Sequence, residues 1–250
     1  PNNALSLNVM KPGEVAATAG TSGVVYGVTD KNDFDPKSRV NTFLHVNNTQ
    51  NNKRLGVLLC LNSVGIFNSW AKRQIGGNML TYSEMNEIAA KVDPGAEGLL
   101  TLPFGNGAER MLENKNIGAS FHGLNLINHK QGHIIRSIHE GIAFAFNYGI
   151  EIIQNMGLKL NVIRAGMANM FQSGIFVQTL SNISNAKIEL YNTSGAEGAA
   201  RGAAIGLGYY NSTEDAFSSL EVLKTVEPEA NNQVAEYYNL WKEILENSLK

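Results

Sequence analysis

The second half of the chain alternates short apolar strands with helices, and this alternation limits the folds open to it. Residues 160–164 and 187–190 have the composition of buried strands, and each is followed by a segment with helical periodicity, at 171–183 and 195–208. Two strands joined through a helix lie parallel, with the helix covering one face of their sheet. The pattern therefore predicts an α/β fold with a partly parallel sheet.

The first half adds a predicted hairpin. Residues 14–19 and 24–29 are β-favouring runs on either side of the glycine-bounded turn Gly20-Thr21-Ser22-Gly23. Further strands are expected at 42–46 and 55–61, an extended stretch at 99–104, and an irregular polar segment from there to about residue 128. Apolar residues at helical spacing predict helices at 62–76, 81–93, 130–156, 214–224 and 229–249.

No linker or internal repeat interrupts these elements, so we expect one domain with its core at 1–210 and a helical end at 211–250. Thr81 and Glu84 have the spacing of a capping box. In the last helix Val234, Tyr237 and Trp241, with Ile244, form an apolar stripe that we interpret as core.

Composition excludes several classes of function. The 250 residues are 43% apolar and 17% charged, with a net charge of −2, so no basic surface indicates nucleic acid or an anionic membrane as a partner. No apolar run approaches the roughly 18 residues that cross a bilayer. The single Cys60 excludes an internal disulfide or a multi-cysteine zinc site and fits a reducing, cytoplasmic location. Because the sequence begins at Pro1 and not Met, we expect a chain cut from something longer.

Three glycine-rich clusters are the candidate sites. The turn Gly20-Thr21-Ser22-Gly23 would let backbone N–H groups approach a phosphate, with two hydroxyls as further donors. An ordinary hairpin turn is the alternative, and the motif by itself favours that alternative. It is not a Walker A loop, because the Gly-Lys-Ser/Thr ending is missing and a strand follows.

The second cluster, 164–171, follows a strand and precedes a helix, where ligands of α/β sheets bind, although a plain loop would have the same composition. The third cluster, 194–206, has Gly198, Gly202 and Gly206 on one helix face, and Ser194 with Glu197 forms a capping box at its start. Each glycine costs roughly 1 kcal/mol of stability relative to Ala in a helix, so a close contact must compensate. We expect this face to pack against another element of the fold; a ligand beside it is the less favoured alternative.

Two pairs of titratable residues are further candidates for a functional role. His129 and His133 lie four residues apart on one helix, the spacing of half a metal site, but no third ligand is evident, so structural or capping roles are favoured. Glu109-Arg110 is interpreted as a solvated ion pair.

Several motifs then follow one another in a recognisable order. They are Gly20-Thr21-Ser22-Gly23, Asn62-Ser63-Val64-Gly65 through Trp70, Leu102-Pro103-Phe104 with Glu109-Arg110, Phe121-His122-Gly123-Leu124, His133 to Arg136 with Glu140 to Phe144, Arg164-Ala165-Gly166, and Gly195 to Gly206. Over essentially the whole chain this order resembles the C-terminal domain of the FGGY family of carbohydrate kinases. The xylulokinase branch is the most similar, through residues 165–171.

The resemblance implies an actin-like ATPase domain of ribonuclease H-like fold, with a mixed β-sheet flanked by helices. It implies that the domain binds ATP with Mg²⁺ against a separate N-terminal sugar-binding domain, and it is compatible with a homodimer. By position, Thr21 and Ser22 after Gly20 would contact phosphate, and Gly65 the phosphate or ribose region. Gly166, Ala168 and Asn169 would contact the nucleoside.

The sequence departs from the family pattern in two places. The family's catalytic base is an Asp that would precede Pro1, so we expect no catalytic residue in this chain and no activity from the chain alone. Ala165 and Met167 stand where the family has glycines.

D-xylulose is the expected substrate. The alternatives are another FGGY sugar kinase, acting on fuculose, rhamnulose, gluconate or glycerol, a non-sugar actin-like ATPase, or an interaction module without enzymatic activity.

Overall fold

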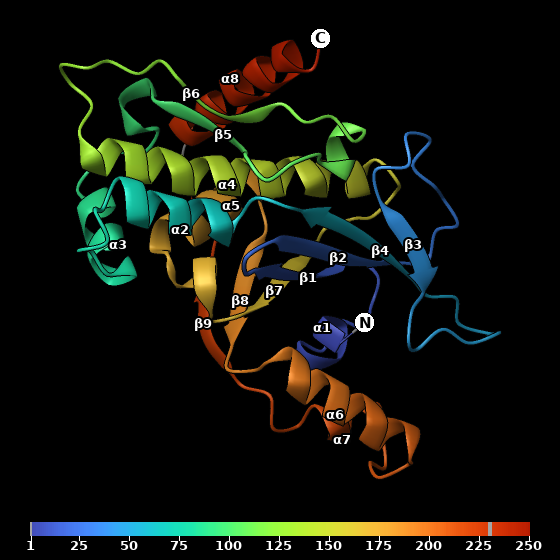
Figure 1. Ribbon diagram of the computed structural model, residues 1–250. Helices are drawn as coiled ribbons and strands as arrows, with labels where there is room; N and C mark the ends of the chain where they lie inside the picture. Colours follow the sequence, from blue (N-terminus) through green and yellow to red (C-terminus); the bar gives the residue numbers. More distant parts are fainter. Residues whose placement is uncertain (1, 230–231) are drawn as a thin grey trace.

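A seven-stranded sheet in the order β3-β4-β2-β1-β7-β8-β9 forms the centre of the molecule (Figure 1). The computed structural model describes residues 2–229 and 232–250. The strands are β1 (Glu14–Ala19), β2 (Gly23–Thr29), β3 (Asn41–Leu44), β4 (Leu55–Leu61), β7 (Val162–Gly166), β8 (Lys187–Tyr191) and β9 (Val222–Val226). β7 pairs parallel with β1 and β8, and the other pairs are antiparallel. The predicted hairpin and the predicted mixed sheet are both confirmed.

Alternate residues of the central strands face two different layers. Val15 and Ala17 of β1 belong to the main core, under α4 (Gln131–Gln154), whereas Ala16 belongs to a smaller cluster on the opposite face. α4 is buried along nearly its whole length, because α3 (Tyr82–Ala90), α5 (Gly174–Ser184), α8 (Asn232–Ser248) and the two-stranded sheet β5 (Leu100–Phe104) and β6 (Gly118–His122) pack around it (Figure 1). α2 (Gly65–Gln74) lies beside it.

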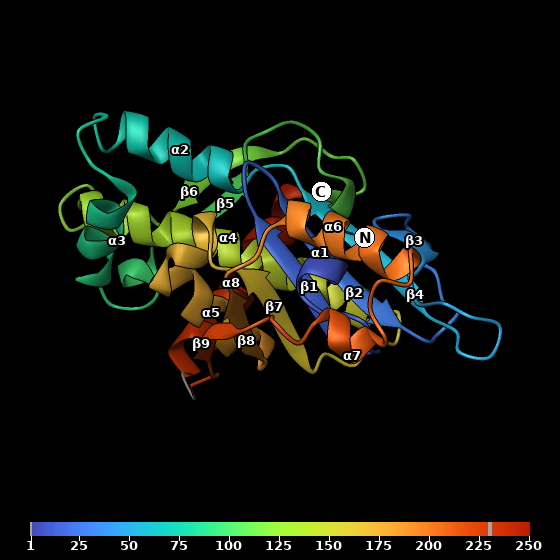
Figure 2. The same ribbon diagram turned by 90° about the horizontal axis from the view of Figure 1, so that it is seen from below.

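On the opposite face of the sheet the short helix α1 (Asn2–Ser6) contacts β1, and a second helix packs closely on α1. This second helix is α6 (Gly195–Gly206), which lies on α1 as the view from below shows (Figure 2). A Cβ atom on Gly198 would lie 2.1 Å from the carbonyl oxygen of Asn2, and one on Gly202 would lie 2.7 Å from Leu5 Cδ1. The expected close packing of this glycine face is confirmed at Gly198 and Gly202, whose partner is α1, whereas a Cβ on Gly206 would have no neighbour within 4 Å. Ser194 Oγ accepts from the Glu197 N–H, which is one half of the predicted capping box, whereas the Glu197 carboxylate accepts from the Ser194 and Thr193 hydroxyls and not from the Ser194 N–H.

Two sequence-based assignments are wrong. The expected helix at 214–224 is a single turn, α7 (Thr213–Ala216), followed by the edge strand β9, in which β-branched Val222, Thr225 and Val226 complete the sheet against β8. The segment expected to be irregular up to residue 128 contains the 3₁₀ turn η2 (Arg110–Leu112) and the strand β6, which pairs with β5. Another 3₁₀ turn, η1 (Ala96–Gly98), precedes β5. Residues 211–250 are therefore not purely helical.

The remaining helices begin and end close to the expected positions. The Thr81 capping box is present, and Trp241 of the C-terminal stripe is fully buried in the main core. α5 starts later than expected, because residues 169–172 form the 3₁₀ turn η3 (Asn169–Gln172) and Ser173 caps the helix. Pro1 and residues 230–231 of the last expected helix lie outside the described residues. Across the described ranges, no helix has both the length and the apolar content to cross a bilayer.

Candidate functional site

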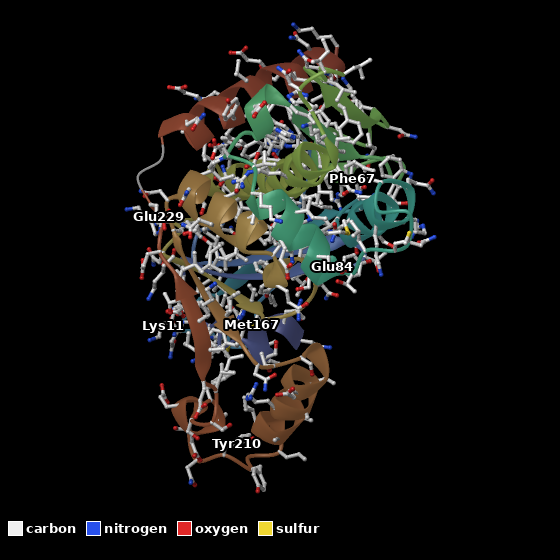
Figure 3. All side chains as sticks on the ribbon, turned by 90° about the vertical axis from the view of Figure 1, so that its left-hand side faces the viewer. Lys11, Phe67, Glu84, Met167, Tyr210 and Glu229 are labelled. Atoms are coloured by element: carbon white, nitrogen blue, oxygen red, sulfur yellow. The ribbon has the colours of Figure 1, made fainter. Side chains whose placement is uncertain are left out.

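Four segments that are distant in sequence enclose one polar cleft of about 390 Å³. They are the turn between β1 and β2, the first half of α2, the start of α3, and the η3 turn that leads into α5. Figure 3 shows this side of the molecule, with Glu84 marking α3 and Met167 marking the end of β7. We call it the hairpin cleft; its lining residues are Gly20, Thr21, Gly65, Ile66, Asn68, Ser69, Tyr82, Asn86, Asn169, Met170, Gln172 and Ser173.

The hairpin turn is fixed by direct backbone bonds to the start of α2. The Gly65 N–H donates to the Gly20 carbonyl at 2.8 Å, and the Ile66 N–H donates to the Thr21 carbonyl at 3.1 Å. These carbonyls satisfy two of the N–H groups that a helix start leaves unpaired. A Cβ on residue 65 would lie 2.4 Å from the Gly20 oxygen, so only glycine allows this approach. Gly65 therefore serves first to hold the turn.

The other wall of the cleft is formed by the segment that connects β7 to α5. The Met167 N–H donates to the Tyr191 carbonyl at 2.8 Å, and Ala168 N–H donates to the Gly166 carbonyl at 2.8 Å. The chain then turns through Asn169, whose φ of 54° lies in the left-handed region that asparagine tolerates better than most residues. Asn169 Nδ2 lies 3.9 Å from the position that a Cβ of Gly20 would take. Asn169 and the hairpin turn thus face each other across the cleft.

Of the seven site residues predicted from sequence, the structure brings four together. Gly20, Thr21, Gly65 and Asn169 line the hairpin cleft. The other three are not among its lining residues: Ser22 lies at the exposed tip of the turn, and Gly166 and Ala168 form the backbone that leads to Asn169.

Several lining residues are not predicted from the sequence, namely Asn68, Ser69, Tyr82, Asn86, Gln172 and Ser173. Helical spacing could have found two of them, because Asn68 and Ser69 lie three and four residues after Gly65 and so share its face of α2. Tyr82 and Asn86 share a face of α3 for the same reason, but nothing local indicates that α3 approaches the hairpin.

A buried carboxyl group holds the backbone that leads into α2. Glu109 is 1% exposed, and its two carboxylate oxygens accept from the Asn62 N–H at 2.9 and 3.0 Å, just before α2 begins. Burial raises the pKa of Glu109 to about 7. The hydrogen bonds from the backbone N–H groups of Asn62 and Ser63 lower the pKa, but their effect is smaller than that of burial. Arg110 turns away and donates to the Ser38 carbonyl and to Asn41 Oδ1. The expected solvated Glu109–Arg110 ion pair is therefore wrong, because each side chain has backbone or amide partners of its own.

Only one of the two histidines lies on the expected helix: His129 precedes α4, which begins at Gln131, and His133 caps its start. His129 Nδ1 accepts from the Asn125 N–H at 3.0 Å, and His133 Nδ1 accepts from the Lys130 N–H at 3.2 Å. Within the described part of the chain, no group of three or more His, Cys, Asp or Glu side chains is placed to hold a metal ion.

A larger cavity, of about 650 Å³, lies between α5 and β9 and includes Lys224 and Glu227 in its lining. It shares Gln172 with the hairpin cleft but contains none of the seven predicted site residues. The hairpin cleft is the better candidate, because two separate glycine-rich turns meet there. Its lining residues carry no charge, and they offer hydroxyl, amide and backbone groups to a ligand.

Comparison with known proteins supplies the family. Residues 15–210 match the family model described as the FGGY family of carbohydrate kinases, C-terminal domain. The chain belongs to the FGGY family of carbohydrate kinases. A gluconokinase of Bacillus licheniformis is 30% identical over 195 residues, which cover 69% of this chain and 37% of that protein. A xylulose kinase of Bacillus subtilis (strain 168) is 27% identical over 214 residues, or 85% of this chain and 42% of that protein.

Solved structures of the family share the fold. The crystal structure of xylulose kinase from Rhodospirillum rubrum superposes on 98% of this FGGY-family chain with a TM-score of 0.86, at 20% sequence identity, and the match covers 49% of that kinase. The expected actin-like ATPase fold is thus confirmed. The chain spans less than half the length of the gluconokinase and the xylulose kinase that it resembles in sequence.

Proposed function

We propose that the hairpin cleft binds the ATP of a carbohydrate kinase, and that the complete protein transfers the γ-phosphate to a sugar hydroxyl. The observation that carries this proposal is the convergence of the Gly20–Gly23 turn, the start of α2 and Asn169 on one uncharged polar cleft. Phosphoryl transfer depends mainly on holding phosphates in position and compensating their charge. A fixed turn that presents backbone N–H and hydroxyl groups suits the first of these tasks.

The residues present fit a nucleotide. A Cβ on Gly20 would have only Ser22 O at 3.8 Å and Asn169 Nδ2 at 3.9 Å near it, so a phosphate can approach the turn's backbone without a steric barrier. We assign Thr21 to phosphate and Asn169 to the nucleoside. Ser22, which does not line the cleft, is the weaker phosphate candidate, and Gly166 and Ala168 would act by shaping the loop that carries Asn169.

Mg²⁺ would arrive bound to the nucleotide. It commonly keeps several water ligands and binds phosphate oxygens with only one or two carboxylates. The lining of the hairpin cleft contains no carboxylate, so we assign no protein ligand to it in this chain. Bound Mg²⁺ would compensate the phosphate charge that the uncharged cleft does not.

The base that accepts the sugar hydroxyl proton is proposed to lie outside this chain. None of the residues lining the hairpin cleft is an Asp, Glu or His, and those are the usual side chains for this role. By the family resemblance, an Asp and the sugar site would come from the other domain. We therefore expect the 250-residue chain alone to bind nucleotide without turnover.

D-xylulose is the proposed substrate. The resemblance at residues 165–171 and the similarity to xylulose kinases in sequence and fold support it, whereas the gluconokinase similarity supports gluconate as the second candidate. The test is ADP release by the complete protein with ATP, Mg²⁺ and one of D-xylulose, gluconate, glycerol, fuculose or rhamnulose. Release that requires one sugar is expected. ADP release independent of every sugar would favour an actin-like ATPase, and absence of nucleotide binding would favour an interaction module.

A matched pair of variants tests the cleft itself. Thr21→Val removes a hydroxyl from the cleft lining at nearly constant volume, whereas Ser22→Ala removes one from the exposed tip of the same turn. We expect Thr21→Val to raise the dissociation constant for Mg·ADP roughly tenfold, the effect of one lost hydrogen bond, and Ser22→Ala to change it less than threefold. Equal affinities in both variants would remove Thr21 from the site.

A further inference from the structure

One buried histidine joins the two walls of the hairpin cleft. His139 lies on α4 and is 1% exposed. Its Nε2 lies 3.1 Å from Asn68 Oδ1, on α2, and its Nδ1 lies 3.0 Å from Ser173 Oγ, at the start of α5. Asn68 and Ser173 both line the cleft, and His139 does not.

The partners of His139 fix where its proton lies. A carboxamide oxygen can only accept, so Nε2 carries the hydrogen and donates to Asn68 Oδ1. Nδ1 is then the acceptor, and the Ser173 hydroxyl donates to it. Ser173 Oγ in turn accepts from the Phe176 N–H, which caps α5. Burial, with a smaller contribution from Arg136, lowers the pKa of His139 to about 4, so the ring is neutral near pH 7.

In this arrangement the Asn68 carboxamide has its oxygen toward His139. Because Oδ1 is bonded to His139, the NH₂ group of Asn68 is left to other partners, and it donates to no protein acceptor among the described residues. An amide N–H in a cleft lining can donate to a phosphate oxygen or to a nitrogen of a base. With the amide rotated by 180°, an oxygen would meet that ligand acceptor and repel it.

We propose that His139 is a positioning residue for nucleotide binding, which acts by holding the Asn68 NH₂ group toward the ligand and by tying α2 to the start of α5. The proposal rests on the proposed function, since the ligand it concerns is the nucleotide. His139 would thus set nucleotide affinity without touching the nucleotide.

Two polar variants separate the two bonds. In His139→Gln the side-chain amide reaches about as far as Nε2 and can still meet Asn68, whereas in His139→Asn it reaches only as far as Nδ1. We expect His139→Asn to raise the dissociation constant for Mg·ADP about tenfold, measured by calorimetry on the complete protein, and His139→Gln to stay within about threefold of wild type. Ser181→Ala, which removes another fully buried hydrogen bond on α5, is the control and should leave affinity unchanged.

A double-mutant cycle decides whether His139 works through Asn68. If it does, His139→Asn in an Asn68→Ala background should cost almost nothing further in affinity. A full additional tenfold loss there, or wild-type affinity in the single His139→Asn variant, would overturn the inference while leaving the proposed function intact. Failure of the wild-type protein to bind Mg·ADP would overturn the proposed function and this inference together.

Discussion

Replacing Gly65 by alanine should break the contact that fixes the hairpin cleft. The new Cβ would lie 2.4 Å from the Gly20 carbonyl oxygen and 3.0 Å from its carbon, where ordinary contact begins near 3.4 Å. Both opposing atoms are backbone, so the turn must move away from α2 by about 1 Å, at a cost of about 1–3 kcal/mol. The movement also weakens the Gly65–Gly20 and Ile66–Thr21 bonds, of 2.8 and 3.1 Å, which contribute about 1 kcal/mol each.

We therefore expect Gly65→Ala to lose about 3 kcal/mol of unfolding free energy in urea denaturation, and to bind Mg·ADP at least tenfold more weakly. Gly174→Ala is the matched control, because a Cβ there has no neighbour within 4 Å at the start of α5. It should be at least as stable as wild type, since alanine favours a helix more than glycine does. If Gly65→Ala were as stable as Gly174→Ala and bound nucleotide normally, the account of this contact would be refuted.

Three further substitutions test buried charged side chains. Because the folded-state pKa of Glu109 is raised from 4.5 to about 7, its contribution to stability is fully present below pH 4.5 and is lost as the pH rises to 7, a change of about 3 kcal/mol. The stability of Glu109→Gln relative to wild type should therefore rise by up to about that amount between pH 4.5 and 8, and parallel curves for the two proteins would contradict it. Arg136 pairs with buried Glu140 at 2.7 Å, so Arg136→Met should cost about 3–5 kcal/mol in thermal or urea unfolding. Adding Glu140→Gln should recover much of that loss, and no recovery would mean that the cost is not the unpaired charge.

Local signals in the sequence were sufficient for much of the fold. The turn at residues 20–23 has its own glycines, and the strand–helix alternation after residue 160 leads directly to the parallel pair of β7 with β8. The parallel pair of β7 with β1 joins segments about 150 residues apart and has no such local signal. The expected helix at 214–224 includes the first residues of β9, because their strand character depends on pairing with β8, a contact between segments about 35 residues apart.

The site shows the same limit more sharply. Gly20, Thr21, Gly65 and Asn169 could be proposed because each stands in a glycine-rich or family-like motif. Glu109 was misjudged, because its partner, the N–H of Asn62, lies 47 positions earlier in the chain. His139 joins Asn68 and Ser173 across 71 and 34 positions. No local pattern carries such information, since it arises only when α2, α4 and α5 pack together.

The central claim is that nucleotide binds in the hairpin cleft, and amide hydrogen exchange with and without Mg·ADP tests it most directly. Slower exchange in the nucleotide complex is expected at residues 20–22, 65–69 and 169–173, which carry the cleft lining on the hairpin, α2 and η3. Protection confined to residues 224–229, beside the larger cavity between α5 and β9, with the hairpin unchanged, would contradict it.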